Sequence, residues 1–158
     1  MTSHALPGHT LTRNIELNVA AFALLLNFPW EILQVPLFAG MADGPYIDAI
    51  RGCTQAALGD AVIMLFAYWT VSAVSASRAW ILAPTRGQMT LFLAIGIIMT
   101  VAIELLATSG YWVQSWTYSQ AMPIVPGIGV GLSPLVQWIV LPLLAVWLVR
   151  RQLSACTE

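Results

Sequence analysis

The chain has 158 residues, of which 59% are hydrophobic and only 8% are charged, with a net charge of −1 and a mean hydropathy of +0.80. Soluble domains carry about 25% charged residues, so this composition excludes an ordinary soluble domain and indicates a helical membrane protein. The near-neutral charge also excludes the basic footprint of a nucleic-acid-binding protein.

Four apolar stretches follow one another along the chain, each close to the roughly 20 residues that a helix needs to cross a bilayer. We predict membrane spans at about 15–35, 57–77, 88–108 and 132–149. The segment 109–131 between the last two spans carries the aromatic residues Tyr111, Trp112, Trp116 and Tyr118. These predict either an interfacial belt or a lid over an apolar ligand. The expected fold is a single all-α domain over residues 1–158, a bundle of four transmembrane helices.

The arginines predict the orientation of this bundle. Four spans place both termini and the turn at 78–87 on one side of the membrane, and this side holds Arg13, Arg78, Arg86, Arg150 and Arg151. The other side holds only Arg51. By the positive-inside rule we predict that both termini are cytoplasmic. We expect the protein in the cytoplasmic (inner) membrane.

The first span carries polar residues that oil does not accept without compensation. Asn27, Glu31 and Gln34 are spaced at i, i+4 and i+7 and therefore share one helix face. A carboxylate in mid-membrane costs about 2.5–3.5 kcal/mol on insertion scales. Glu31 therefore requires a partner or a function. The alternative to a functional role is a structural hydrogen bond between helices or to a loop amide.

Depth along the helices predicts that further polar residues meet Glu31. Glu31 and Glu104 each lie about 16 residues into spans that begin on the same side, so they reach one level at 1.5 Å per residue. Thr100, Glu104 and Thr108 form a second stripe, and Ser133 and Gln137 a third. The predicted layer comprises Asn27, Glu31, Gln34, Asp60, Glu104 and Gln137, surrounded by Trp30, Trp116, Tyr118 and Trp138. Asp60 either belongs to this layer or caps the second span, and Glu104 either belongs to it or reaches water.

Three acids in one apolar layer, with Arg51 as the nearest cation by topology, predict that a cation binds there or that at least one carboxyl group keeps its proton. A buried protonated carboxyl group is suited to acid–base chemistry. Both histidines lie in the N-terminal segment, and no His–Cys cluster accompanies the acids, so we expect neither a metal nor another cofactor.

The motif Asn27-x-x-Trp30-Glu31, followed by Ile32, resembles the fungal membrane-bound terpene cyclases of meroterpenoid and indole-diterpene pathways. That family carries an Asn-x-x-Trp-Glu motif within a transmembrane helix, and its Glu protonates an epoxide or olefin to start cyclisation. The resemblance implies that Glu31 is a proton donor and that Asn27 and Trp30 line a substrate pocket. The family's chains are larger, and its second acid, an aspartate, has no counterpart by motif here.

These observations lead to three hypotheses. In the first, the protein is an integral membrane enzyme that cyclises or isomerises an apolar lipid or isoprenoid. Glu31 then donates a proton, Glu104 or Asp60 accepts one, and aromatic faces stabilise positive charge. In the second, it is a small proton- or cation-coupled carrier. In the third, it is an accessory subunit whose polar layer joins helices. Because four spans enclose little space, we also expect a homo-oligomer.

Overall fold

The structure, a computed structural model, describes residues 14–111 and 115–155. Its elements in chain order are α2 (Ile15–Gln34), the 3-10 turn η1 (Val35–Leu37), α3 (Tyr46–Val74), the 3-10 turn η2 (Arg78–Leu82), α4 (Arg86–Thr108) and α5 (Leu132–Ala155). Four of the helices are long and apolar enough to cross a membrane, and the described residues contain no strand. The predicted all-α class is therefore confirmed, with four helices that could serve as the predicted spans.

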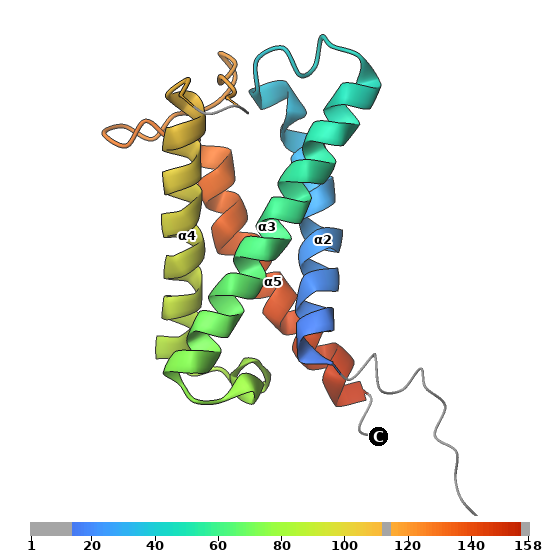
Figure 1. The fold of residues 1–158 in the computed structure, drawn as a ribbon, viewed down its shortest axis with the longest axis vertical. Helices are drawn as coiled ribbons and strands as arrows, with labels where there is room; N and C mark the ends of the chain where they lie inside the picture. The colour runs from blue at the N-terminus through green and yellow to red at the C-terminus, as the bar shows by residue number, and fades with distance from the viewer. Residues whose placement is uncertain (1–13, 112–114, 156–158) are drawn as a thin grey trace, which may run out of the picture.

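The long helices alternate in direction through the bundle (Figure 1). The start of α2, the end of α3, η2, the start of α4 and the end of α5 lie at one end, which we call the turn end. Residues 35–45, 109–111 and 115–131 lie at the opposite end, which we call the loop end. Residues near the end of α2 and α4 therefore share a level with residues near the start of α5.

Side-chain caps set where two of these helices begin. Asn14 accepts a hydrogen bond from the Leu17 amide at 3.0 Å, so α2 begins at the next residue, Ile15. Thr85 and Gln88 form a capping box at the start of α4, in which each residue satisfies a backbone amide of the other. These caps hold both helix starts at the turn end.

The second long helix differs from its prediction. It begins at Tyr46, directly after Pro45, whereas the membrane span was predicted from about residue 57. The glycines of this stretch suggested a loop, yet Gly52 and Gly59 are both helical, and Gly52 leaves room for the Met41 side chain. Asp60 consequently lies in the interior of α3, so its interpretation as a helix cap is wrong.

Apolar side chains fill the levels between the two ends. Val19 and Ala23 of α2 pack in one buried cluster with Met64 and Ala67 of α3. Alanines at such positions allow helix backbones to approach closely. This apolar layer separates the polar groups of the turn end from those of the loop end.

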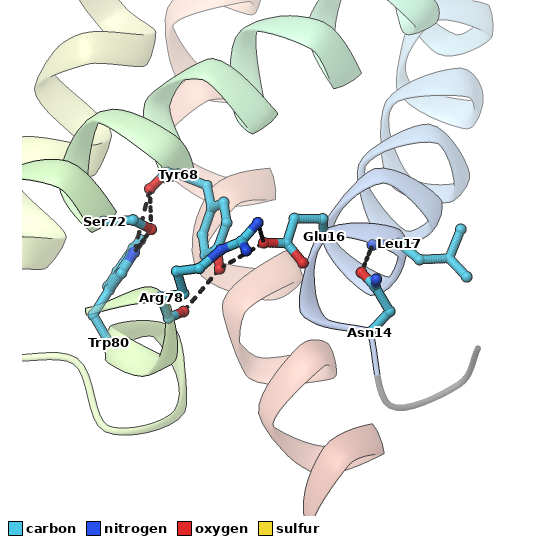
Figure 2. A network of polar contacts seen from close by, with 7 residues as sticks. All are labelled: Asn14, Glu16, Leu17, Tyr68, Ser72, Arg78 and Trp80. Atoms are coloured by element: carbon cyan, nitrogen blue, oxygen red, sulfur yellow. Dashed lines mark hydrogen bonds and ion pairs between the residues drawn. The ribbon is translucent and has the colours of Figure 1, made fainter. Parts of the chain in front are cut away.

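The turn end holds a polar network that the sequence did not reveal (Figure 2). Arg78 of η2 forms an ion pair with Glu16 of α2 at 2.5 Å, and its carbonyl accepts a hydrogen bond from the Tyr68 hydroxyl at 2.8 Å. The Trp80 indole donates to the Ser72 hydroxyl at 3.1 Å and stacks on Tyr68. The network therefore ties η2 to both α2 and α3.

Candidate functional site

A cavity of about 430 Å³ lies at the loop end of the bundle. All four long helices contribute to its wall: Glu31 from α2, Asp60 from α3, Glu104 from α4 and Gln137 from α5. Its volume falls within the range of about 300–1,000 Å³ that is usual for small-molecule pockets. The three acids of the predicted layer thus surround one cavity.

Gln137 connects two of these acids. Its amide nitrogen Nε2 lies 2.8 Å from Glu31 Oε1, 2.9 Å from Asp60 Oδ2 and 2.8 Å from Asn27 Oδ1. Gln137 is fully buried on α5, as is Asn27 on α2. A single side-chain amide therefore gathers oxygen atoms from three residues of two other helices.

This arrangement is short of hydrogen-bond donors. A primary amide carries two N–H groups, while three oxygen atoms surround the Gln137 nitrogen. Glu31 Oε1 and Asp60 Oδ2 both contact this one nitrogen, so the two carboxyl groups lie close together, with no arginine among the described residues of the cavity wall. A proton on either carboxyl group would supply the missing donor and remove their repulsion.

Gln34 extends the network toward the start of α5. Its amide nitrogen lies 3.4 Å from Gln137 Oε1, and its carbonyl oxygen accepts a hydrogen bond from the Ser133 hydroxyl at 2.9 Å. The Gln34 side chain is buried. These contacts fix the orientation of the Gln137 amide, so that its nitrogen faces the two carboxyl groups.

Glu104 is held in a different way. Its oxygen Oε2 accepts hydrogen bonds from the Trp116 indole nitrogen at 3.2 Å and from the Tyr118 hydroxyl. Both donors use the same oxygen atom, so neither occupies Oε1. The Tyr118 hydroxyl in turn accepts from the Gly131 amide at 3.0 Å. These contacts tie Glu104 of α4 to the segment that follows this helix.

Tyr118 lies outside the membrane-spanning helices, and its environment favours the neutral phenol. Partial burial, followed by the hydrogen bond to Glu104, raises the pKa of Tyr118 above its ordinary value. The phenol therefore remains a hydrogen-bond donor over the whole neutral range.

The connections of the loop end join one another across the cavity. Residues 38 and 118 form an antiparallel bridge, and the Ala39 amide donates to the Thr117 carbonyl at 2.9 Å. The Phe38 ring contacts the rings of Trp116 and Tyr118 at centroid distances of 6.3 and 5.8 Å. Phe38 and Trp116 also line the cavity, so this part of the aromatic segment belongs to the cavity wall.

The rest of the aromatic segment is arranged differently. Tyr111 is 95% exposed, as expected of an interfacial residue. Trp112 lies outside the described residues. The described part of this segment therefore combines one exposed aromatic residue, Tyr111, with another, Trp116, on the cavity wall.

The predicted site residues divide into two groups. Those that line the cavity are Glu31, Gln34, Asp60, Glu104, Trp116, Gln137 and Trp138. Asn27, Trp30 and Tyr118 do not line it. Asn27 and Tyr118 instead support lining residues, through Gln137 and Glu104. The Trp30 indole nitrogen is buried and has no hydrogen-bond partner within the described part of the chain.

Arg51, the nearest cation by topology, does not reach the acids. Arg51 lies in the first turns of α3, pairs with Asp48 at 3.5 Å and is largely exposed. No arginine is among the described residues that line the cavity. The acids are therefore compensated by amide, hydroxyl and indole groups and not by an ion pair.

Some residues of the cavity wall were not predicted from the sequence. Phe38, Met41 and Cys53 line the cavity, but none of them carries a polar marker of a site. Cys53 lies seven residues before Asp60 in α3, which is the spacing of one helix face. An earlier start of that helix would have predicted its place.

No group of three His, Cys, Asp or Glu side chains within the described residues is arranged to hold a metal ion. Comparisons of the chain with protein-family models, with curated proteins and with solved structures found no match. The likeness to the terpene cyclases is thus confined to the short motif around Trp30 and Glu31.

Proposed function

We propose that this chain is an integral membrane enzyme that carries out acid–base chemistry on an apolar lipid or isoprenoid, such as cyclisation or double-bond isomerisation. The observation that carries the proposal is the contact of Glu31, Asp60 and Gln137 on the wall of a cavity that Glu104 also lines. A protonated carboxyl pair and a separate carboxylate are the two groups that such a reaction needs.

In the proposed reaction Glu31 is the acid. It gives its proton to one carbon of a double bond, whose π electrons form the new C–H bond. The neighbouring carbon becomes a cation. The indoles of Trp116 and Trp138, which line the cavity, stabilise this charge by about 0.5–2 kcal/mol each.

Glu104 is the base of the second step. Its carboxylate takes a proton from a carbon next to the cation, and the C–H electron pair forms the new double bond. If another double bond of the substrate first attacks the cation, the product is a ring. The proton taken up by Glu104 then returns to the Glu31–Asp60 pair, so the enzyme ends as it began.

Deuterium incorporation tests this proposal. Wild-type protein in nanodiscs, incubated in D₂O with the isoprenoid lipids that copurify with it, should add deuterium to carbon, as measured by mass spectrometry. General acid catalysis contributes about 10²–10⁴-fold, so Glu31→Gln should slow incorporation at least about 100-fold. Asp48→Asn is the matched control, because Asp48 is exposed and pairs with Arg51 away from the cavity. Equal rates in wild type and Glu31→Gln would refute the enzyme.

The same variant separates the two other hypotheses. A carrier would show proton uptake in liposomes that Glu31→Gln abolishes, with no deuterium in any lipid. An accessory subunit would tolerate Glu31→Gln in every assay. The buried apolar layer of Val19, Ala23, Met64 and Ala67 between the two polar ends favours the enzyme over the carrier, which needs a polar path.

The proposal includes an orientation with both termini in the cytoplasm. The turn end carries Arg78, Arg86, Arg150 and Arg151, whereas the loop end carries Arg51. A Cys156→Ser background with Ala83→Cys in the connection from η2 to α4 tests it. A membrane-impermeant maleimide should label position 83 only after the cells are lysed. Labelling in intact cells would reverse the orientation.

A further inference from the structure

Thr100 on α4 lines the cavity, and its hydroxyl group has no hydrogen-bond partner among the described residues. It lies one helical turn before Glu104, lines the cavity and is 6% exposed. Its oxygen Oγ1 is buried and has no hydrogen-bond partner among the described residues. Buried hydroxyl groups are normally satisfied, so an unsatisfied one on a cavity wall points to a ligand.

Other hydroxyl residues of these helices behave differently. Thr54, Thr70, Ser72 and Thr108 each donate to the carbonyl oxygen four residues earlier, at 2.7–2.9 Å. This is the usual way in which a helical hydroxyl group is satisfied. Thr100 departs from this pattern at the place where the helix borders the cavity. Its hydroxyl group is thus available to a bound molecule.

We infer that the cavity binds a neutral, oxygen-bearing isoprenoid or lipid, whose alcohol, epoxide or carbonyl oxygen hydrogen-bonds to the Thr100 hydroxyl. This inference rests on the proposed function, because it names the substrate class of the same cavity. It also assigns a binding role to Thr100, distinct from the proton transfers of Glu31 and Glu104.

The charges of the wall decide between neutral and anionic ligands. Glu31, Asp60 and Glu104 line the cavity, and the described wall residues include no arginine. A phosphate or carboxylate headgroup would meet like charges without a cation to compensate them. A neutral oxygen can accept from Thr100 without that penalty. Isoprenoid diphosphates are accordingly excluded as ligands, whereas their alcohols fit.

The test compares two molecules that differ in one oxygen-bearing group. Farnesol and the hydrocarbon farnesene are titrated into the full-length protein in detergent, and apparent affinities are read from thermal stabilisation. One neutral hydrogen bond corresponds to about 3- to 10-fold in affinity. Wild type should prefer farnesol by about that factor, Thr100→Val should lose the preference, and Thr100→Ser should keep it.

The affinity of Thr100→Val for farnesene serves as an internal control and should equal that of wild type. If Thr100→Val does not fold, Thr100→Cys takes its place, since a thiol is a much weaker donor than a hydroxyl group. Unchanged preference for farnesol in the valine or cysteine variant would overturn the inference. Failure of wild type to bind either molecule would also overturn it.

Glu31→Gln distinguishes this inference from the proposed function. The variant should bind farnesol with the same Thr100-dependent preference while losing deuterium incorporation. If wild type shows the preference but never adds deuterium to carbon, the proposed enzyme is wrong and the binding role of Thr100 stands.

Discussion

Each end of the bundle contains buried or half-buried acids, but their partners differ. At the turn end Glu16 meets Arg78, and the Tyr68 hydroxyl and Trp80 indole are satisfied by nearby oxygens (Figure 2). At the loop end Glu31, Asp60 and Glu104 gather around a cavity, and no salt bridge within the described chain reaches them.

The partners of a buried acid determine whether it can exchange a proton. An acid with a cation beside it is neutralised in place and holds helices together. Acids whose donors are amide, hydroxyl and indole groups can still exchange a proton with a bound molecule, because no fixed positive charge holds them ionised. The Glu31–Asp60 pair is of the second kind.

The largest expected effect comes from removing an acid of the loop end, and removing an acid of the turn end provides the comparison. Glu104→Gln takes away the proposed base and should reduce deuterium incorporation about 100-fold or more. Glu16→Gln removes an acid of the turn end and should leave incorporation unchanged. Both are measured by mass spectrometry on protein that elutes as a single folded species. Comparable losses in the two variants would mean that the two ends do not differ in function.

A second comparison uses two glycines of α4. Gly96 lies against the Trp138 indole so closely that an added Cβ would collide with the ring, whereas Gly87 at the turn end has nothing near its Cβ position. Overpacking costs about 1–3 kcal/mol. Gly96→Ala should therefore destabilise the protein by that amount, and Gly87→Ala should be neutral or slightly stabilising.

Thermal unfolding in detergent measures both glycine variants. Because Trp138 also lines the cavity, Gly96→Ala should in addition weaken farnesol binding. Equal stability of the two variants would contradict the close packing of α4 on α5.

Gln137→Leu tests the hub of the loop end. The variant removes the donor that Asn27, Glu31 and Asp60 share. Hydrogen bonds within membranes average about 0.6 kcal/mol. Losing the two bonds that the amide can donate and the one it accepts from Gln34 should therefore cost about 2 kcal/mol in unfolding by detergent or denaturant. Gln55→Leu is the control, since that glutamine lines the cavity but is exposed. If Gln137→Leu costs no more stability than Gln55→Leu, the Gln137 amide does not hold the polar residues of the loop end together.

The sequence predicted most of the layer because helical spacing and depth are properties of the chain itself. Glu31 and Glu104 share a level since both helices start at the turn end, and Gln137 joins them from the opposite direction. Asp60 was uncertain because its place depended on where α3 begins. The glycines near residue 52 suggested a loop, yet α3 runs without a break from Tyr46 to Val74.

Two other features depend on three-dimensional contacts. The pairing of Arg78 with Glu16 joins a connection to a helix far away in sequence, and no periodicity indicates it. The antiparallel bridge between residues 38 and 118 likewise joins two loops. Trp30, prominent in the sequence motif, lies off the cavity wall, since a residue adjacent to Glu31 is rotated by about 100° around the helix.

The pH dependence of Tyr118 gives a smaller effect at the loop end. Its pKa is raised by burial and by Glu104, so the folded protein holds the phenolic proton more tightly than the unfolded chain. The resulting stabilisation is complete below the ordinary tyrosine pKa of about 10 and is lost as the pH rises through the folded-state value. Above about pH 10 the unfolding temperature should therefore fall more steeply with pH for wild type than for Tyr118→Phe. Parallel curves would contradict the shift.

The smallest expected effect belongs to the ion pair of the turn end. The Arg78 side chain is 73% exposed, and exposed ion pairs contribute at most about 1 kcal/mol. Arg78→Ala should thus cost less than about 1 kcal/mol in thermal unfolding, and added salt should reduce that cost. The variant keeps the Arg78 carbonyl that accepts from Tyr68, so η2 stays attached to α3. Tyr68→Phe removes that contact from a fully buried ring and should cost at least as much, without dependence on salt. A loss well above 2 kcal/mol for Arg78→Ala would mean that the acid of the turn end depends on its cation far more than an exposed pair allows.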